Sequence, residues 1–488
     1  MYRSAMEYLK EWKTRSNRKP LIIRGARQVG KSHLVRDFAK QEFTTFAEIN
    51  LDEDLSVVPY FDKLDPRETL RLLELHFETT LEPGRTLLFI DEIQAAPQLL
   101  AKLRYFYEKL PDLHVIAAGS LLDFTLEQHD FSMPVGRIEY LHLGPMSFSE
   151  FLLATGHEQS CAFLKAFKIG DDIPEPLHNK LSDLLVSYIV VGGMPESVKA
   201  FAERKSYREC DFIKSSILAT YKEDFSKYGR KVNLQHILTV YEALPNLVGR
   251  KVKYVNISRD IRSRDLSQAL QMLALARVCH LVHHASCNGI PLGAEMDKHT
   301  FKPLFLDVGL LLSANGLSMT DIPDVEALML VNSGQICEQF VGQHLLYRQE
   351  LYKQPELHYW LREKPSSNAE VDYVIASGQR IVPIEVKAGK TGNLRSLHQF
   401  TIEKGVDFAI KICTERPSLV KASGKMPDGR PYDSHILSLP FYLIEKLAYA
   451  NTDFLKDVVL SIQSGGTLTP PIGRITRPQP GYASSGSR

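Results

Sequence analysis

The first 150 residues alternate between short apolar runs and longer amphipathic segments. Short apolar runs bounded by polar residues predict buried strands, and apolar positions three and four residues apart predict helices. Strands that alternate with helices in this way indicate a parallel α/β sheet up to about residue 150. The predicted strands lie at 19–25, 46–52, 86–92, 114–120 and 137–145, and the helices between them at 32–41, 68–81 and 97–110.

The pattern changes after residue 150. Three helical stretches lie between residues 149 and 221 and predict a helical lid or linker. Residues 231–312 predict helices followed by two apolar strands around the turn NGIPLG, which is the order of a winged helix-turn-helix. A helix at 334–352 and three strands between 357 and 389 then predict a second α/β domain.

Composition narrows the class of protein. The chain has 488 residues, of which 44% are apolar and 24% charged, so a fibrous or wholly disordered protein is excluded. The formal net charge of +1 gives no general attraction to nucleic acid or anionic lipid, so any basic surface must be local. The six cysteines form no C-x-x-C pair, and no secretory or membrane-spanning apolar stretch is present. We therefore expect a cytoplasmic protein without membrane contact.

A glycine-rich stretch follows the first predicted strand. GARQVGKS at residues 25–32 fits the pattern G-x-x-x-x-G-K-[ST] and opens a predicted helix. In this pattern main-chain N–H groups wrap the phosphates, the lysine reaches the β- and γ-phosphates, and the hydroxyl can ligate Mg²⁺. We expect the flanking Arg24 and Arg27 to face solvent. The residues expected to bind ATP are Gly25, Gln28, Val29, Gly30, Lys31 and Ser32.

Two acids end a later apolar strand. Leu87–Ile90 is followed by Asp91 and Glu92. Parallel strands of one sheet end at the same edge, so Asp91 can join the Mg²⁺ shell of a bound nucleotide. The adjacent Glu92 is suited to polarise an attacking water. This second carboxylate favours hydrolysis over transfer of the phosphoryl group to a substrate.

Together these residues resemble the AAA+ ATPases. The resemblance implies that Ser120, at the end of the strand HVIAAGS, senses the γ-phosphate. It also implies that Arg137 in PVGRIEY is an arginine finger supplied to a neighbouring subunit, where it stabilises the transferring phosphate. A homo-oligomer is expected for that reason.

A second constellation lies near the carboxyl end. Glu385 and Lys387 are two apart on a predicted strand and share one face, and Asp372 precedes them by the length of a hairpin. With Glu338 on a helix, these carboxylates make a tentative second metal site, at which Lys387 positions a water. The arrangement looks like the core of PD-(D/E)XK nucleases, with Gln399 as an additional contact. The alternative is an ordinary charged hairpin.

The resemblance extends over most of the chain, from about residue 5 to residue 447. The motifs that carry it occur in one order: GARQVGKS, LLFIDEIQ, PVGRIEYLHLGPMSFSEFL, GGMPES, FKPLFLDVGLL, AEVDYVI and IEVKAGK. This set is similar to a large group of prokaryotic AAA family ATPases that bear a C-terminal domain of unknown function. The expected α/β architecture is a P-loop AAA+ core at 1–155, a helical lid at 156–230, a winged helix at 231–312, a nuclease-like domain at 320–447 and a disordered tail at 464–488.

Other sequence features bear on partners. Residues 230–290 contain nine Lys or Arg and only three Asp or Glu. Four of the arginines lie on or near the presumed recognition helix, namely Arg259, Arg262, Arg264 and Arg277. Phosphate contacts by these side chains would give salt-dependent DNA binding, although a solvated basic face is the alternative. The run CHLVHHASC at 279–287 holds zinc-ligand residue types, but as a strand it would place them on opposite faces, so we expect no zinc site.

Three functions remain open on this basis. The first is an ATP-hydrolysing AAA+ switch whose winged-helix and nuclease-like parts engage DNA. The second is an ATP-gated, metal-dependent DNA nuclease. The third is an ATP-dependent switch that acts on another protein and carries a degenerate nuclease fold.

Overall fold

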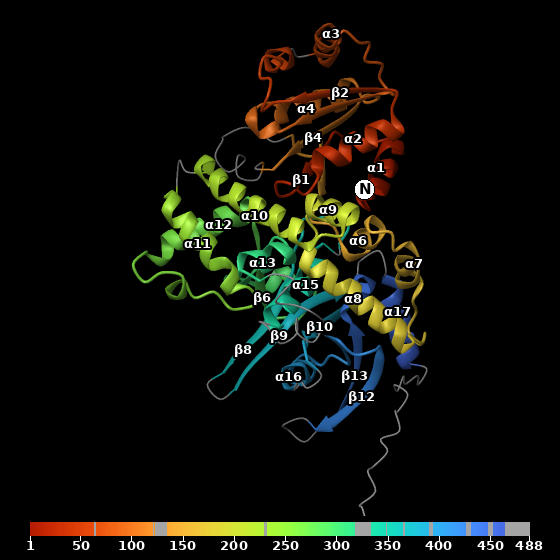
Figure 1. Cartoon of the computed structure of the whole chain (residues 1–488), viewed down its shortest axis with the longest axis vertical. Helices are drawn as coiled ribbons and strands as arrows, with labels where there is room; N and C mark the ends of the chain where they lie inside the picture. The colour runs from red at the N-terminus through yellow and green to blue at the C-terminus, as the bar shows by residue number, and fades with distance from the viewer. Residues whose placement is uncertain are drawn as a thin grey trace, which may run out of the picture.

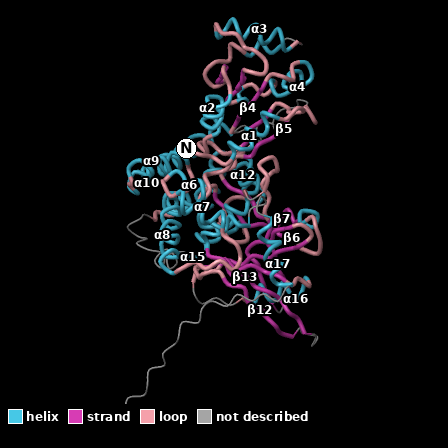
Figure 2. Tube along the Cα trace, turned by 90° about the vertical axis from the view of Figure 1, so that its right-hand side faces the viewer, coloured by secondary structure: helices cyan, strands magenta, loops and turns pink. Residues whose placement is uncertain are grey.

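The computed structural model describes residues 1–62, 65–120, 122, 134–228, 232–317, 333–347, 349–364, 367–389, 394–425, 431–447 and 452–463. The tail expected at 464–488 lies outside these residues. A smaller sheet with its helices lies at one end of the long axis of the molecule, and a larger sheet lies toward the other end, with helices between them (Figure 1). The view turned by 90° shows the strands in the same two separate groups (Figure 2).

The smaller sheet has five strands in the order β2-β3-β4-β1-β5, all of them parallel. Its central strands β3 and β4 are buried along their whole length, as their continuous apolar runs predict. The parallel α/β sheet expected for the first 150 residues is therefore confirmed. The strands are β1 (Leu21–Arg24), β2 (Thr45–Asn50), β3 (Thr86–Asp91), β4 (His114–Gly119) and β5 (Glu139–His142), and the helices are α1 (Ala5–Thr14), α2 (Lys31–Glu42), α3 (Pro66–Phe77) and α4 (Leu99–Lys109).

Helices follow this sheet, as expected from the sequence. A capping box begins α6, in which the Ser147 side chain accepts from the Glu150 amide and the Glu150 carboxylate accepts from the Ser147 amide. The long helix α8 is mostly apolar and ends at Gly192, whose φ of 80° is left-handed. The helices are α6 (Phe148–Ala154), α7 (Glu158–Ala166), α8 (Glu175–Val191), α9 (Pro195–Arg204), α10 (Tyr207–Asp224), α11 (Leu234–Leu247), α12 (Ser263–Leu275) and α13 (Val308–Ala314).

The larger sheet has eight strands and is mixed, in the order β12-β13-β11-β10-β9-β8-β6-β7. Its elements are β6 (Cys279–Ala285), β7 (Met296–Phe305), β8 (His358–Lys364), β9 (Ser367–Ser377), β10 (Arg380–Val386), β11 (Phe408–Cys413), β12 (Ser418–Lys425) and β13 (Pro431–Pro440), with helices α15 (Ser333–Leu346), α16 (Arg395–Lys404) and α17 (Thr452–Gln463).

The strand pair expected to form the wing, β6 and β7, belongs to this larger sheet. β6 pairs with β7 on one side and in parallel with β8 on the other, where His283 lies opposite His358. The two segments that the sequence divides at about residue 312 thus share one sheet. The winged-helix and nuclease-like assignments remain predictions.

One hydrophobic core connects the two sheets. It extends from Leu21 and Leu141 of the smaller sheet through Tyr188 on α8 to Ile384 and Ile410 of the larger one. Main-chain hydrogen bonds also cross the boundary, from the His142 amide to the Leu351 carbonyl at 2.7 Å. The smaller sheet is therefore packed directly against the carboxyl half. Within the described residues, no helix combines the length and the apolar character needed to cross a bilayer.

Candidate nucleotide-binding site

The turn between β1 and α2 has the geometry of a phosphate-binding loop. Gly30 is the N-cap of α2 with φ 89°, and no side chain caps the first turn of this helix. The amide groups at such a helix start have no partner within the helix, and they attract anions. At Gly25 a Cβ atom would lie 2.3 Å from the Leu143 carbonyl oxygen, so the loop can approach β5 only because glycine stands there. The sequence motif therefore folds into the structural context that a P-loop requires.

Lys31 supplies the positive charge of the loop. Its side chain is buried, and Nζ donates to the carbonyl oxygens of Gly25 at 3.1 Å and Ala26 at 2.8 Å. Burial lowers the pKa of Lys31 to about 8, although the carboxylates of Glu92 and Asp91 partly offset this effect. An ammonium held only by neutral carbonyl groups can exchange them for phosphate oxygens.

Asp91 ends β3 and meets Ser32 at the start of α2. Burial raises the pKa of Asp91, while a hydrogen bond from the Ser32 side chain lowers it. A hydroxyl and a carboxylate side by side are the hard oxygen ligands that Mg²⁺ prefers. The residues of this site therefore fit a magnesium–nucleotide complex, in which the ion would neutralise phosphate charge.

Glu92 follows Asp91 in a left-handed conformation with φ 51°. Its main-chain N–H donates to Asp91 Oδ1 at 3.0 Å, and its carboxylate accepts a hydrogen bond from the side-chain Nε2 of Gln94. Gln94 therefore orients the candidate catalytic carboxylate. The sequence analysis did not single out Gln94, because a glutamine two residues beyond an acid has no distinctive spacing.

Ser120 lies directly after β4, the strand between β1 and β3. Its hydroxyl accepts a hydrogen bond from Arg27 Nε at 3.3 Å, and Arg27 Nη1 lies 2.8 Å from Asp224 Oδ1 at the end of α10. The expectation that Arg27 faces solvent is therefore wrong. The cause is α10, which brings a buried carboxylate against the loop from 197 residues away. Arg24 packs its guanidinium over the Tyr140 ring, with 4.0 Å between the guanidinium carbon and the ring centroid.

Arg137 lies on the surface of the same part of the chain. Its Nε pairs with Glu108 Oε1 on α4 at 3.1 Å, and about half of each side chain is exposed. An exposed ion pair of this kind contributes little to stability and can be exchanged for another partner. The expected action of Arg137 on a neighbouring subunit stays a prediction.

The carboxyl-terminal carboxylates do converge, but a lysine lies among them. The buried Lys302 on β7 places Nζ at 3.4 Å from Glu338 Oε2, 3.0 Å from Glu370 Oε1 and 3.9 Å from Asp372 Oδ1. Neither Lys302 nor Glu370 was singled out from the sequence, because the two residues are 68 positions apart and only the folded chain brings their side chains together. The feature of the sequence that could have indicated Lys302 is its position as a charged residue in the apolar strand FKPLF.

Asp372 and Glu385 of this cluster have further protein partners, whereas the buried Glu385 Oε2 accepts no hydrogen bond within the described residues. Asp372 Oδ2 accepts from the Val386 amide at 2.7 Å, and Lys387 Nζ lies 2.6 Å from Glu385 Oε1. Burial and the neighbouring Asp372 raise the pKa of Glu338 to about 8 and that of Glu385 to about 7.

Metal ligands must be deprotonated and must face one ion. In the described part of the chain, no three or more His, Cys, Asp or Glu side chains are grouped to hold a metal ion. Lys302 lies among Glu338, Glu370 and Asp372, and the metal site expected at residues 338, 372 and 385 stays a prediction. Gln399 lies on α16, which packs against β9 and β10.

The four arginines singled out in the 231–312 segment divide into two groups. Arg259, Arg262 and Arg264 are exposed around the start of α12. Arg277 is buried just after the end of α12, where its φ is 60°. Only the first three can contact a partner without rearrangement.

Comparisons with known proteins agree with the amino-terminal site. Residues 17–152 match a family model described as an AAA domain. Residues 182–321 and 333–424 match two models described as domains of unknown function, DUF8612 and DUF4143. No curated protein matches the chain. The amino-terminal part is thus similar to an AAA domain, which supports ATP binding and hydrolysis.

Two solved structures show distant overall likeness. The ORC2 protein of Aeropyrum pernix, solved as ADPNP–ADP complexes, is 11% identical, with a TM-score of 0.33 over 64% of this chain and 94% of its own. The Holliday junction branch migration motor RuvB of Thermotoga maritima is 14% identical, with a TM-score of 0.27 over 57% of this chain and 87% of its own. Scores this low define neither the fold nor the function.

Proposed function

We propose that this chain is a Mg²⁺-dependent ATPase of the AAA type that works as a molecular switch. The phosphates of ATP bind the start of α2 and Lys31, and Ser32 and Asp91 hold the Mg²⁺ ion that neutralises them. One observation carries this proposal. Ser32 at the start of α2 and Asp91 at the end of β3 meet in a hydrogen bond beside the buried Lys31.

Hydrolysis, and not transfer to a second substrate, follows from Glu92. This carboxylate lies next to the metal-binding Asp91 and is oriented by Gln94, so it can accept a proton from an attacking water. Ser120 at the end of β4, together with Arg27 of the loop, which donates a hydrogen bond to it, provides polar contacts for the γ-phosphate. In an oligomer, Arg137 of one subunit completes the site of the next.

The switch acts on a partner through the carboxyl half. Lys302 at the centre of the carboxylate cluster favours a binding or transmitting role over a metal-dependent nuclease. The nuclease hypothesis needs those carboxylates free to hold a metal ion.

Besides another protein, DNA is the second candidate for the partner of the switch. The exposed Arg259, Arg262 and Arg264 gather at the amino-terminal end of α12, the part of a recognition helix that enters the major groove. Three arginines supply phosphate contacts and a salt-dependent affinity.

ATP turnover tests the proposal. The full chain and its Lys31→Ala variant are compared without DNA and with duplex, single-stranded and branched DNA, and the same samples are analysed for DNA cleavage in Mg²⁺ and Mn²⁺. We expect turnover by the wild type only. Equal turnover by both proteins would contradict an ATPase at this site. Stimulation by DNA would support the DNA candidate, whereas turnover indifferent to every DNA would leave a protein partner.

A further inference from the structure

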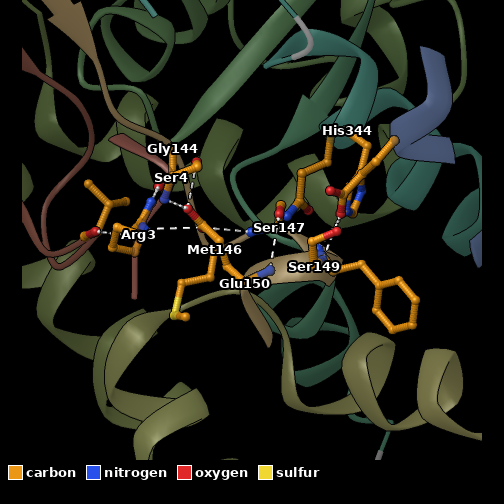
Figure 3. A network of polar contacts seen from close by, with 12 residues as sticks. Arg3, Ser4, Gly144, Met146, Ser147, Ser149, Glu150 and His344 are labelled. Atoms are coloured by element: carbon orange, nitrogen blue, oxygen red, sulfur yellow. Dashed lines mark hydrogen bonds and ion pairs between the residues drawn. The ribbon is translucent and has the colours of Figure 1, made fainter. Parts of the chain in front are cut away.

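Arg3 holds the P-loop from outside the AAA motifs. This buried side chain precedes α1, and its Nη1 donates to the carbonyl oxygen of Val29, inside the loop, at 2.8 Å. Its Nη2 donates to the carbonyl oxygen of Gly144 at 2.8 Å, and its Nε lies 3.1 Å from Glu150 Oε2. One planar guanidinium therefore joins the nucleotide loop to the segment that leaves the parallel sheet (Figure 3).

The hydrogen bond to Val29 acts on the main chain of the phosphate-binding loop. The Val29 carbonyl and the Gly30 amide belong to one planar peptide group and point in opposite directions. A guanidinium bonded to the carbonyl oxygen fixes the direction of the Gly30 N–H, which is at the start of α2. Conversely, an anion drawn to that N–H polarises the peptide and strengthens the bond to Arg3.

Glu150 anchors the other side of Arg3. The carboxylate is buried, with Oε1 accepting from the Ser4 amide at 2.6 Å and Oε2 accepting from the Ser147 amide at 3.0 Å. Glu150 thereby ties the entry to α1 to the first turn of α6. Arg3 contacts Glu150, and Glu150 accepts hydrogen bonds from Ser4 and from Ser147 at the start of α6. A movement of Arg3 therefore shifts the start of α6, because these bonds break if Glu150 alone follows Arg3.

The start of α6 in turn contacts the carboxyl half. The Phe148 amide donates to His344 Nε2 on α15 at 3.2 Å, and the Ser149 amide donates to Glu445 Oε1 at 2.8 Å. Gly144 packs so closely on Tyr347 that a Cβ there would lie 2.6 Å from the ring. Figure 3 shows the polar contacts that join Arg3, Glu150 and Ser147, and the neighbouring start of α6 with Ser149 near His344.

We propose that Arg3 is a positioning residue of the ATPase, and that Arg3 and Glu150 transmit the state of the P-loop to α15. This inference rests on the proposed ATPase function. ATP at the loop strengthens the hydrogen bond between Arg3 and the Val29 carbonyl. Because Arg3 also pairs with Glu150, the resulting shift reaches the start of α6, where the Phe148 and Ser149 amides contact His344 and Glu445.

The test uses Arg3→Lys and Glu150→Gln in the full chain. Lysine keeps the charge but cannot reach Val29, Gly144 and Glu150 together. We expect kcat/KM for ATP to fall by roughly tenfold or more, since misplacement of a phosphate-binding loop by about 1 Å is costly. The loss in the double variant should be smaller than the product of the two single losses, because both changes act on one route.

A second readout separates transmission from simple support of the fold. In the wild type, an ATP analogue should slow amide hydrogen exchange at residues 333–347. In Arg3→Lys this nucleotide effect should disappear while the analogue still binds. The matched control is Arg85→Lys, because Arg85 is an exposed arginine with a surface partner, Glu82.

Each outcome has a distinct meaning. Wild-type kcat/KM and an unchanged exchange difference in Arg3→Lys would overturn the inference, as would a wild type without any nucleotide effect at 333–347. If the Arg3 variant does not fold, Glu150→Gln alone decides between these outcomes. Turnover that survives Lys31→Ala would instead contradict the ATPase proposal itself.

Discussion

Tyr221 on α10 donates a hydrogen bond from its hydroxyl to the carbonyl oxygen of Arg27, inside the P-loop, at 2.8 Å. The same helix holds the Arg27 side chain through Asp224. The nucleotide loop is thus contacted on its main chain and on its side chain by one helix from beyond the AAA domain match, which ends at residue 152. The following predictions concern this loop and the carboxylate cluster.

Replacement of Asp224 should loosen the loop. Asp224→Asn removes the charge that faces Arg27, and since the pair is largely buried we expect a loss of roughly 1–3 kcal/mol in the free energy of unfolding. Urea unfolding measures this loss. Glu242→Gln is the control. Glu242 on α11 forms an exposed pair with Lys222, which lies on α10 like Asp224, and this pair should contribute under about 1 kcal/mol to the free energy of unfolding. Equal effects of the two changes would contradict the assigned importance of Asp224.

Glu92→Gln should separate ATP binding from hydrolysis. Glutamine keeps the size of the side chain but cannot accept the proton of an attacking water, so kcat should fall by about 10²–10⁴-fold. The affinity for ATP should change by less than about threefold, because the phosphates bind Lys31 and the loop. Single-turnover hydrolysis and equilibrium binding of ATP measure the two quantities. A variant that hydrolyses ATP at the wild-type rate would exclude Glu92 as the base.

ATP affinity should fall as the pH rises above about 8. The pKa of Lys31 is lowered to about 8 in the protein without nucleotide, and bound phosphates favour the ammonium form. Below pH 8 the lysine is already charged, so affinity should be nearly constant there. Above pH 8 binding requires uptake of a proton, and Kd should rise by up to about tenfold per pH unit.

The matched control for this pH effect is Lys31→Arg. A guanidinium keeps its charge over the whole range, so any binding that this variant retains should not show the loss above pH 8. Titrations of ATP between pH 6.5 and pH 9.5 compare the two proteins. A parallel fall in both would assign the effect to another group.

The carboxylate cluster should depend on Lys302 and not on a divalent metal ion. Lys302→Met leaves Glu338, Glu370 and Asp372 without their shared cation, and we expect a loss of about 3–5 kcal/mol in the free energy of unfolding. Lys421→Met is the control, since Lys421 forms an exposed pair with Asp433.

Manganese binding gives a second measurement on the same cluster. Nucleotide-free wild type should bind no Mn²⁺ that depends on Asp372. Saturable Mn²⁺ binding that is lost in Asp372→Asn would contradict the lysine-centred arrangement and restore the nuclease hypothesis.

The local elements could be predicted because their causes are local. Gly25 and Gly30 at their spacing allow the turn between β1 and α2, and the apolar run before Asp91 predicts a buried strand that ends in a carboxylate. The position of β6 and β7 could not be predicted in this way. A strand pair with apolar residues satisfies a wing as well as the edge of a large sheet, and only the pairing of β6 with β8 distinguishes them.

The sequence by itself determined the parallel sheet, the P-loop and the carboxylates that face it, because the alternation of apolar runs with amphipathic segments and the spacing of the glycines are local properties of the chain. Tertiary structure alone decided which partners the buried charges of Arg3 and Lys302 and the half-buried charge of Arg27 have. A buried charge needs an opposite charge or several hydrogen-bonding groups to offset its loss of hydration. Those groups come from residues between 26 and 197 positions away along the chain, and only the folded chain brings them together.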